Sequence, residues 1–380
     1  MNAFNVNIRA DASINAGYLK KAVTAAVCVA CFAATGAAQA GPIVIPNGDF
    51  SISTNAGTIG GGVIGGVAVD LGIGSSGGPW TGSFHGAIGL LVPPTLTIDA
   101  AAHTATIDGL LGVNVGGIAT NGGYFSQTTG APYLPNKRYT VSANVDTGGP
   151  LSAVALGSAN VGISLRSGAT VLSSSATAPA ALVDLSLLSS TNYRLKLIYD
   201  TGASVSGNVD VQLFDLPQGL LTANLLGSVS FGGVSLNVGA ITDSNTQLAV
   251  SGLSSQGAEV DTPFGAPLVA KVTDQGNNPM EGVIVTVSAP ASGASAILTS
   301  GNMSGTSVEA VTDANGEITL SAAANSIAGC YAVTASVDGT TSKAVFHLRN
   351  WSNQQMMRFL DSGSNMQQVL QDSIFCYGFE

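Results

Sequence analysis

The chain has 380 residues, of which only 9% are charged, 45% are hydrophobic and 49 are glycines. This hydrophobic content is too high, and the charge too low, for an intrinsically disordered protein, so we expect the chain to fold. The formal net charge is −10 and the sequence contains no basic run. Because such a surface repels phosphate backbones and anionic membranes, the composition argues against nucleic acid as a partner.

The first forty residues have the features of a secretory signal peptide with a long leading region. Lys20 and Lys21 precede the apolar run AVTAAVCVACFAATGA, and the small residues AQA end the segment. We therefore expect residues 1–40 to be removed on export, and Cys28 and Cys31 with them. Neither cysteine stands at the far end of the apolar run, where a lipoprotein carries its lipidated cysteine. No later apolar stretch reaches the ~20 residues of a membrane-spanning helix.

The sequence after the signal peptide alternates apolar and polar residues with a period of two. Clear examples are YTVSANVD at 139–146, YRLKLIYD at 193–200 and NVDVQLF at 208–214. This period is that of a half-buried strand, with one face on the core and one in water. Short runs of this kind, separated by clusters of Gly, Ser, Asn and Pro, predict an all-β sandwich.

The remaining ~340 residues are long for one domain, so we expect two. A polar stretch at 239–257 separates two differently patterned runs of strands, and we place a boundary near residue 245. This gives a first domain at 41–245 and a second at 246–350. The segment 351–380 differs in composition and is predicted to be a C-terminal tail.

The stretch VTDANGEITL in the second domain places oxygen-bearing side chains at alternate positions, as a calcium loop does. An EF-hand loop needs Gly at its sixth position and Glu at its twelfth, whereas Gly316 is fourth here and Ala324 is twelfth. Asn315 and Gly316 stand between two alternating runs, and this pair is a strong signal for a hairpin turn. We therefore expect a hairpin and not a metal site.

Three pieces of the second domain carry a family resemblance. They are GAPLVAKVTDQGNNPMEGVIVTVSAP at 265–290, TDANGEITL at 312–320 and AGCYAVTASVDG at 328–339. In this order and spacing they resemble the bacterial Ig-like domain of the invasin and intimin group, over about 246–349. The resemblance implies an Ig-like β-sandwich that acts as a spacer or adhesive module on a bacterial surface, without catalysis.

The first domain has a looser resemblance to galactose-binding-like jelly rolls, the fold of many carbohydrate-binding modules. It is carried by IPNGDFS at 45–51, which resembles the first strand of such modules, by 122–148, and by LGSVSFGGVSLN at 226–237, which resembles their closing strand. The family often has Glu where Ser51 stands, and Asp in place of a glycine of the last piece. The resemblance implies a jelly-roll-like sandwich that recognises sugars, with Asp49 as a lone candidate ligand of a structural metal ion.

Four aromatic residues in Gly-rich or turn-bearing parts of the first domain are candidate ligand-binding residues: Trp80, Tyr124, Phe125 and Tyr133. Flat rings exposed on loops stack on sugar faces or anchor a protein partner. The alternative is that these rings are ordinary residues of the core or of a lid.

Two glycine-rich stretches match motifs that carry chemistry. GIGSSG at 72–77 fits a dinucleotide fingerprint, and GSSGG at 74–78 fits a nucleophile elbow. Both motifs work only at the start of a helix, whose N-terminal amides cradle a phosphate or present the serine. Pro79 and a Gly/Ser-rich context follow instead, so we interpret both matches as chance.

The histidines and the acidic pair of the first domain do not predict a catalytic centre. A zinc site or a triad needs partners that converge, and the spacing of the three histidines does not require it. The two aspartates stand at predicted strand ends, where Asp favours turns. These residues are His85, His103, His347, Asp99 and Asp108. We expect no catalytic residue, metal or cofactor.

Cys330 and Cys376 remain after removal of the signal peptide. In an oxidising compartment they can pair, and the bridge would restrict the unfolded chain by roughly 3–4 kcal/mol. The last residues, DSIFCYGFE, resemble a short C-terminal signature on exported proteins of some soil and plant-associated gammaproteobacteria. An aromatic-rich final strand that docks on the preceding domain is the simpler interpretation.

Taken together, these patterns predict an exported surface or secreted protein of a Gram-negative bacterium, without enzymatic activity. The jelly-roll-like first domain would recognise glycans or other cell-surface components, and the Ig-like domain would be its spacer, as in an adhesin. A purely structural protein of an extracellular matrix or surface layer is the alternative, and an unrecognised hydrolase is the third. Neither the ligand nor the oligomeric state is predicted.

Overall fold

The computed structural model describes residues 41–52, 69–73, 79–86, 95–115, 122–147, 158–177, 191–218 and 221–352. Within these ranges the chain is all β, with no helix, and the fold class predicted from the sequence is confirmed. No helix in this part of the chain therefore has the length and apolar character to cross a membrane.

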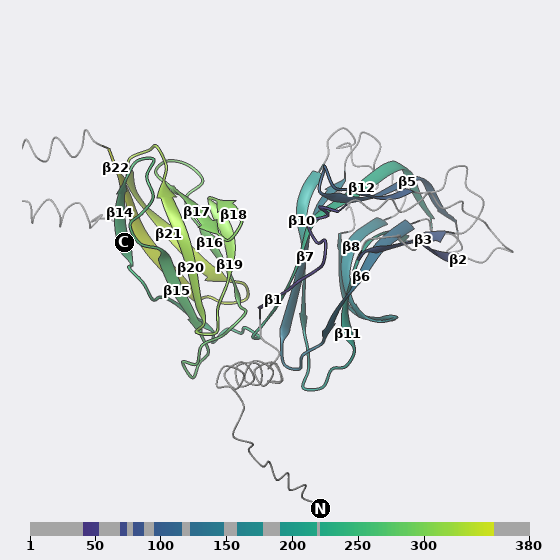
Figure 1. The fold of residues 1–380 in the computed structure, drawn as a ribbon, viewed down its shortest axis with the longest axis horizontal. Helices are drawn as coiled ribbons and strands as arrows, with labels where there is room; N and C mark the ends of the chain where they lie inside the picture. The colour runs from purple at the N-terminus through teal and green to yellow at the C-terminus, as the bar shows by residue number, and fades with distance from the viewer. Residues whose placement is uncertain are drawn as a thin grey trace, which may run out of the picture. The chain divides into compact units, whose positions relative to one another are not determined.

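The first group of strands forms two facing sheets, seen in the purple to teal part of Figure 1. One sheet has the order β10-β7-β12-β5-β4, with β1 paired to β12, and the other has the order β2-β3-β6-β11-β8-β9. All pairs in both sheets are antiparallel. The strands are β1 (Gly41–Ile43), β2 (Val69–Ile73), β3 (Thr81–Gly86), β4 (Thr95–Asp99), β5 (Thr104–Val115), β6 (Gly122–Pro132), β7 (Arg138–Thr147), β8 (Ser158–Ser167), β9 (Thr170–Thr177), β10 (Thr191–Asp200), β11 (Asn208–Gln218) and β12 (Leu221–Gly239).

The second group forms another pair of sheets, green to yellow in Figure 1. Their orders are β13-β15-β20-β17-β18 and β14-β22-β21-β16-β19, and β14 runs parallel to β22. The strands are β13 (Gln247–Val250), β14 (Ser255–Glu259), β15 (Leu268–Thr273), β16 (Ile284–Ser288), β17 (Ala296–Ser300), β18 (Met303–Gly305), β19 (Ser307–Val311), β20 (Glu317–Ala324), β21 (Gly329–Val337) and β22 (Lys343–Trp351).

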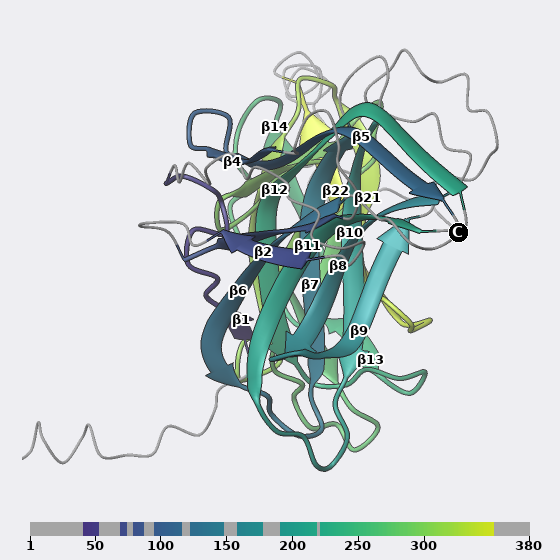
Figure 2. The ribbon, with the colours of Figure 1, turned by 90° about the vertical axis from the view of Figure 1, so that its right-hand side faces the viewer.

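Apolar and polar side chains alternate along the strands, and the apolar side chains of each group of strands form a separate core. In β7, for example, Tyr139, Val141 and Val145 are buried, because every second side chain of a strand faces the same way. The first core draws on residues between 45 and 238, and the second on residues between 248 and 348. The boundary predicted near residue 245 lies between them, and the division into two independently folding domains stays a prediction. Figure 2 shows β6, β11, β8 and β9 side by side in one layer of the first sandwich.

Two local expectations were wrong. The segment 45–51 is a series of turns and not a first strand, because Asn47 and Phe50 have left-handed φ values of 52° and 53°. The turn at Asn315 and Gly316 exists, but β19 pairs with β16 and β20 pairs with β15 and β17, so it joins two sheets and is not a hairpin. Gly316 is needed there, since its φ is 74° and a Cβ would lie 2.5 Å from the Val272 carbonyl oxygen.

Candidate functional site

The aromatic platform expected in the first domain does not form. Trp80 is 0% exposed, Phe125 is 1% exposed and Tyr133 is 4% exposed, so the expectation that they present flat rings to a ligand is wrong. Tyr124, which alternates with Phe125 on β6, is half-buried. The physical reason is that removing apolar rings from water is favourable. A ring is therefore buried in the core even where a Gly-rich or turn segment precedes it in the sequence. The alternative that these rings are core residues describes the three buried ones.

Tyr133 belongs to a cluster of tyrosines that closes one end of the first core. Its ring centroid lies 4.9 Å from that of Tyr139 and 6.2 Å from that of Tyr199, both edge to face. Its hydroxyl donates to the Arg166 carbonyl oxygen at 3.0 Å, as buried tyrosines usually do. Burial is the main cause of a raised pKa for Tyr133, so the phenol stays protonated and acts as a structural donor.

The turn segment at 45–52 is held by side chains from three other parts of the first sandwich. Gln127 Nε2 donates to the Pro46 carbonyl oxygen at 3.0 Å, and Trp80 Nε1 donates to the Asn47 carbonyl oxygen at 3.0 Å. His103 Nδ1 lies 3.1 Å from the Asp49 carbonyl oxygen. The Asn47 carbonyl oxygen also accepts from the Phe50 N–H at 3.1 Å. These contacts satisfy carbonyl groups of the turns, and the segment is fixed as part of the fold.

The same segment does not fit the metal ion that the jelly-roll resemblance suggested. Asp49 is exposed, and its Oδ1 accepts a hydrogen bond from the Ser51 backbone N–H at 3.3 Å. The Ser51 hydroxyl, and after it this backbone N–H, lower the pKa of Asp49. The neighbouring carbonyl oxygens already accept from Gln127 and Trp80. Calcium needs six or more converging oxygens, and within the described ranges no group of three or more His, Cys, Asp and Glu residues converges to hold a metal ion.

The histidines take up separate positions. His85 is on β3, where the register places it opposite Asp70 of β2. His103, with a left-handed φ of 56°, contacts a backbone carbonyl and not a carboxylate. His347 is exposed on β22. Asp99 accepts hydrogen bonds from the backbone N–H groups of Ala101 and Ala102, as expected for Asp at a turn.

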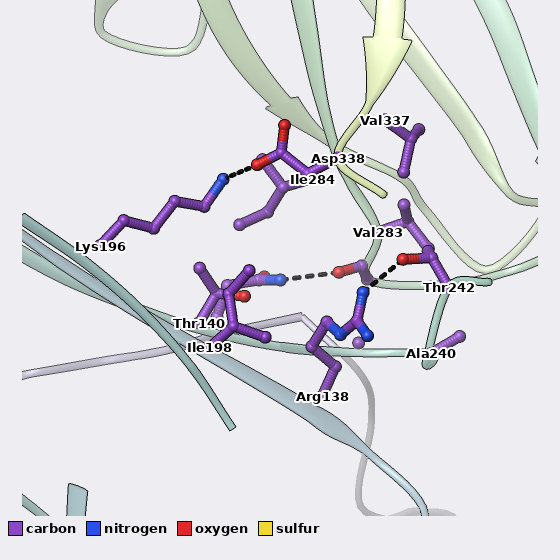
Figure 3. Close-up of a pocket in the computed structure, with 13 residues that line it drawn as sticks. Arg138, Thr140, Lys196, Ile198, Ala240, Thr242, Val283, Ile284, Val337 and Asp338 are labelled. Carbon is purple, nitrogen blue, oxygen red and sulfur yellow. Dashed lines mark hydrogen bonds and ion pairs between the residues drawn. The ribbon is translucent and has the colours of Figure 1, made fainter. Parts of the chain in front are cut away.

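The charged side chains that do converge lie on the outer face of the first sandwich. Arg194 and Lys196 alternate along β10, and the register places Lys196 opposite Ser142 of β7 and Asp200 opposite Arg138. These positions face away from the core because Leu195 and its alternates are buried. Figure 3 shows Arg138 and Lys196 reaching toward residues of the C-terminal half of the chain.

Three ionic contacts join this face to the second group of strands, and one hydrogen bond joins it to the linker before that group. Lys196 Nζ donates to a carboxylate oxygen of Asp338 and lies 4.0 Å from Glu309 Oε1. Arg194 Nη2 lies 3.4 Å from Glu309 Oε2. Arg138 is held by two 2.7 Å hydrogen bonds to Asp200, and this arrangement directs its Nη1 to the Thr242 hydroxyl. We call this set of contacts the polar junction.

Backbone groups complete the polar junction. Asn237 Nδ2 donates to the Gly282 carbonyl oxygen at 2.6 Å, and the Ala240 N–H donates to the Glu281 carbonyl oxygen at 3.0 Å. Gly239 stands so close that an added Cβ would overlap the Gly282 carbonyl group. Asn237 is buried although it faces outward from β12, so this face is covered and not open to water. A small pocket remains between these residues and is lined by Arg138, Lys196, Asn237 and Asp338 among others (Figure 3).

Sequence reasoning missed the polar junction, although one signal was present. Arg194 and Lys196 occupy the polar positions of an alternating strand, and such positions are read as facing water. In a chain with only 12 lysines and arginines, two basic residues on one short strand face are unusual. Their partners, Glu309 and Asp338, are more than a hundred residues away in the sequence, and no local pattern points to them.

Cys330 is disulfide-bonded, and Cys376 lies outside the described residues. The predicted pairing of these two cysteines therefore stays a prediction.

Comparison with known proteins gives little further information. No family model and no curated protein matches the chain. Several solved structures match, among them one named "Biofilm associated protein - BSP domain", with 10% sequence identity and a TM-score of 0.16. That match covers 65% of this chain and 52% of the solved one, so the chain spans about half of its length.

Proposed function

We propose that this chain is an exported, non-enzymatic protein of the bacterial surface or extracellular matrix, in which two β-sandwiches act together as a spacer. The proposal follows the structural alternative, because the aromatic residues expected to bind sugars are buried. An adhesin-like role of the assembly as a whole is compatible with it, but recognition through Trp80, Phe125 or Tyr133 is not part of the proposal.

The observation that carries the proposal is the use of positive charge. Three of the 12 basic residues, Arg138, Arg194 and Lys196, lie at the polar junction. Exposed ion pairs are individually weak, at about 0–1 kcal/mol, but a network with fixed geometry restricts orientation. The bidentate contact of Arg138 with Asp200 supplies that geometry. A chain in which several of the few basic residues connect two sandwiches is suited to transmit force, or to hold its two ends at a fixed distance from each other.

Export is supported by two features. Residues 1–40 have the pattern of a signal peptide, and Cys330 is disulfide-bonded. Disulfides persist in oxidising compartments outside the cytosol. Among the described residues, the acidic and histidine side chains form no converging metal site, and we propose that the protein has no catalytic function.

Small-angle scattering of residues 41–380 tests the coupling. The double variant Arg194→Ser/Lys196→Ser should scatter as a flexible pair of bodies, with a larger maximum dimension and a broader range of conformations than the unaltered chain. Raising the salt concentration should move the unaltered chain in the same direction, because the contacts are ionic. The matched control Lys271→Ser/Lys343→Ser removes the same charge from the second sandwich and should scatter as the unaltered chain does.

A second measurement separates the structural role from its competitors. Residues 41–380 are presented to a panel of glycans and insoluble polysaccharides, and to chromogenic ester and glycoside substrates. The proposal predicts no saturable binding and no turnover. Saturable glycan binding would favour a carbohydrate-recognition module, and turnover abolished by His85→Ala would favour a hydrolase.

In the small-angle scattering experiment, identical scattering of both double variants would show that the polar junction does not couple the sandwiches.

A further inference from the structure

Cys330 lies at one end of an outer sheet face of the second sandwich. It is on β21, opposite Arg349 of β22, and both side chains face away from the core because their neighbours Tyr331 and Leu348 are buried. Cys330 is disulfide-bonded, and Arg349 has an interaction partner as well. Neither residue is therefore a free surface group, and something contacts this end of the sheet.

The described part of the chain ends beside this pair. Trp351 follows Arg349 by two positions and so shares its face, and its indole ring lies against Gly257, where an added Cβ would overlap the ring. The chain continues from residue 352 to residue 380. The 24 residues from 353 to Cys376 reach up to about 80 Å when extended, so the last residues have ample length to return to Cys330.

Only one cysteine fits as the partner of Cys330 in the exported protein. The chain has four cysteines, and Cys28 and Cys31 belong to the predicted signal peptide. We propose that residues 374–380 dock on the outer face of β21 and β22, tied there by a disulfide between Cys330 and Cys376. The occupant of this face is thus the C-terminal end of the same chain.

The chemistry of the two surfaces is complementary. Val345 is 37% exposed on this face and Ala332 is half-buried. The register places Thr334 opposite Val345 and His347 opposite Ala332, so apolar and polar side chains alternate there. The last seven residues, IFCYGFE, contain three aromatic rings and one isoleucine, and burying them removes apolar surface from water. They end in Glu380 and the terminal carboxylate, whose negative charge suits Arg349.

The disulfide makes docking dependent on export. Its formation removes two protons and two electrons from the two thiols, and a disulfide-bearing oxidant of the exporting compartment accepts them and becomes a dithiol. Cytosolic thiols stay reduced. The tail is therefore held to the sheet only after the chain has left the cytosol.

Peptide mapping without reduction tests the linkage. Trypsin cleaves residues 41–380 after Lys271, Lys343 and Arg358, so the proposal predicts one linked species made of peptides 272–343 and 359–380, which separates on reduction. Two free thiols in the denatured, unreduced protein would overturn the proposal. A covalent dimer that reduction converts to monomer would also overturn it, because the bond would then join two copies of the chain.

Limited proteolysis tests docking beyond the linkage. Cleavage by chymotrypsin after Tyr377 should be at least tenfold faster in Val345→Asp than in the unaltered oxidised protein. The control Ile297→Asp places the same charge at an exposed position of the opposite sheet and should leave the rate unchanged. Phe375→Ser/Phe379→Ser leaves both cores untouched and should also accelerate cleavage. Equal rates in all four proteins would show that the tail is linked but not docked, and would overturn the docking.

Discussion

Asp215 is a buried carboxylate on the core-facing side of β11, between Gly123 of β6 and Val161 of β8. It is 4% exposed, and its Oδ1 has no hydrogen-bond partner among the residues that the structure describes. Burial alone raises its pKa from the ordinary value of 3.8 to about 6, because the charged form is poorly solvated in the core. The free energy of unfolding therefore falls as the pH rises from the pKa of Asp215 in the unfolded chain to and through its higher pKa in the folded protein.

The size of this effect follows from the shift. A difference of about two pKa units corresponds to ~3 kcal/mol, since each unit is worth about 1.4 kcal/mol. The full penalty applies above about pH 6 and is absent below about pH 4. Asp215→Asn removes the ionisation but keeps the shape, so its stability relative to the unaltered protein should rise by up to about 3 kcal/mol between pH 4 and pH 7.5. Any fixed cost of the buried amide cancels in this difference.

The assay is urea unfolding of residues 41–380 in a Trp351→Phe background. The chain has two tryptophans, so Trp80, which is buried in the first core, then reports on that core alone. Asp261→Asn removes one negative charge in the second sandwich, at a left-handed φ of 61° that Asn also adopts, and it controls for net charge. An equal stability difference between Asp215→Asn and the unaltered protein at both pH values would refute the reasoning.

Three further predictions concern packing. Gly239→Ala should destabilise the protein by about 1–3 kcal/mol in thermal or urea unfolding, because the new methyl group overlaps the Gly282 carbonyl. Gly202→Ala, whose new Cβ has no atom of the described residues within 4 Å, should change stability by less than about 0.5 kcal/mol, and equal effects would contradict the tight contact. Trp80→Ala should cost about 3–5 kcal/mol in the first core, as measured by the circular dichroism transition, and a loss below about 1 kcal/mol would mean that the ring is not a core residue. Gln127→Met should speed amide exchange at Phe50 about tenfold, equivalent to ~1.4 kcal/mol of local opening, and unchanged exchange would show that the bond to Pro46 does not hold the turn.

Local patterns were sufficient for the strands. The segments 139–146, 193–200 and 208–214 all lie within observed strands, β7, β10 and β11, because the two-residue period of a half-buried strand is written directly in the sequence. The turn at 315–316 was also found from local chemistry. What it connects was not, since a turn between paired strands and a turn between two sheets place the same demands on Asn and Gly.

The exposure of single residues was beyond the reach of these patterns. Trp80 stands in a Gly/Ser-rich stretch that looks like a loop, yet it is fully buried and 5.5 Å from Phe50, ring centroid to ring centroid. The polar positions of β10 looked like a wet face, yet Lys196 reaches Asp338. Whether a side chain meets water depends on which distant segment packs over it, and the sequence does not state that.

The sequence by itself therefore determined the fold class and the strands cited above, because each follows from periodicity and composition over a few neighbouring residues. Only the tertiary structure decided that Trp80, Phe125 and Tyr133 belong to the core, that side chains from distant strands hold the turns at 45–52, and that scarce basic residues form the polar junction. These features depend on contacts between residues dozens to more than a hundred positions apart. Their partners are selected by packing and register, and a local pattern carries neither.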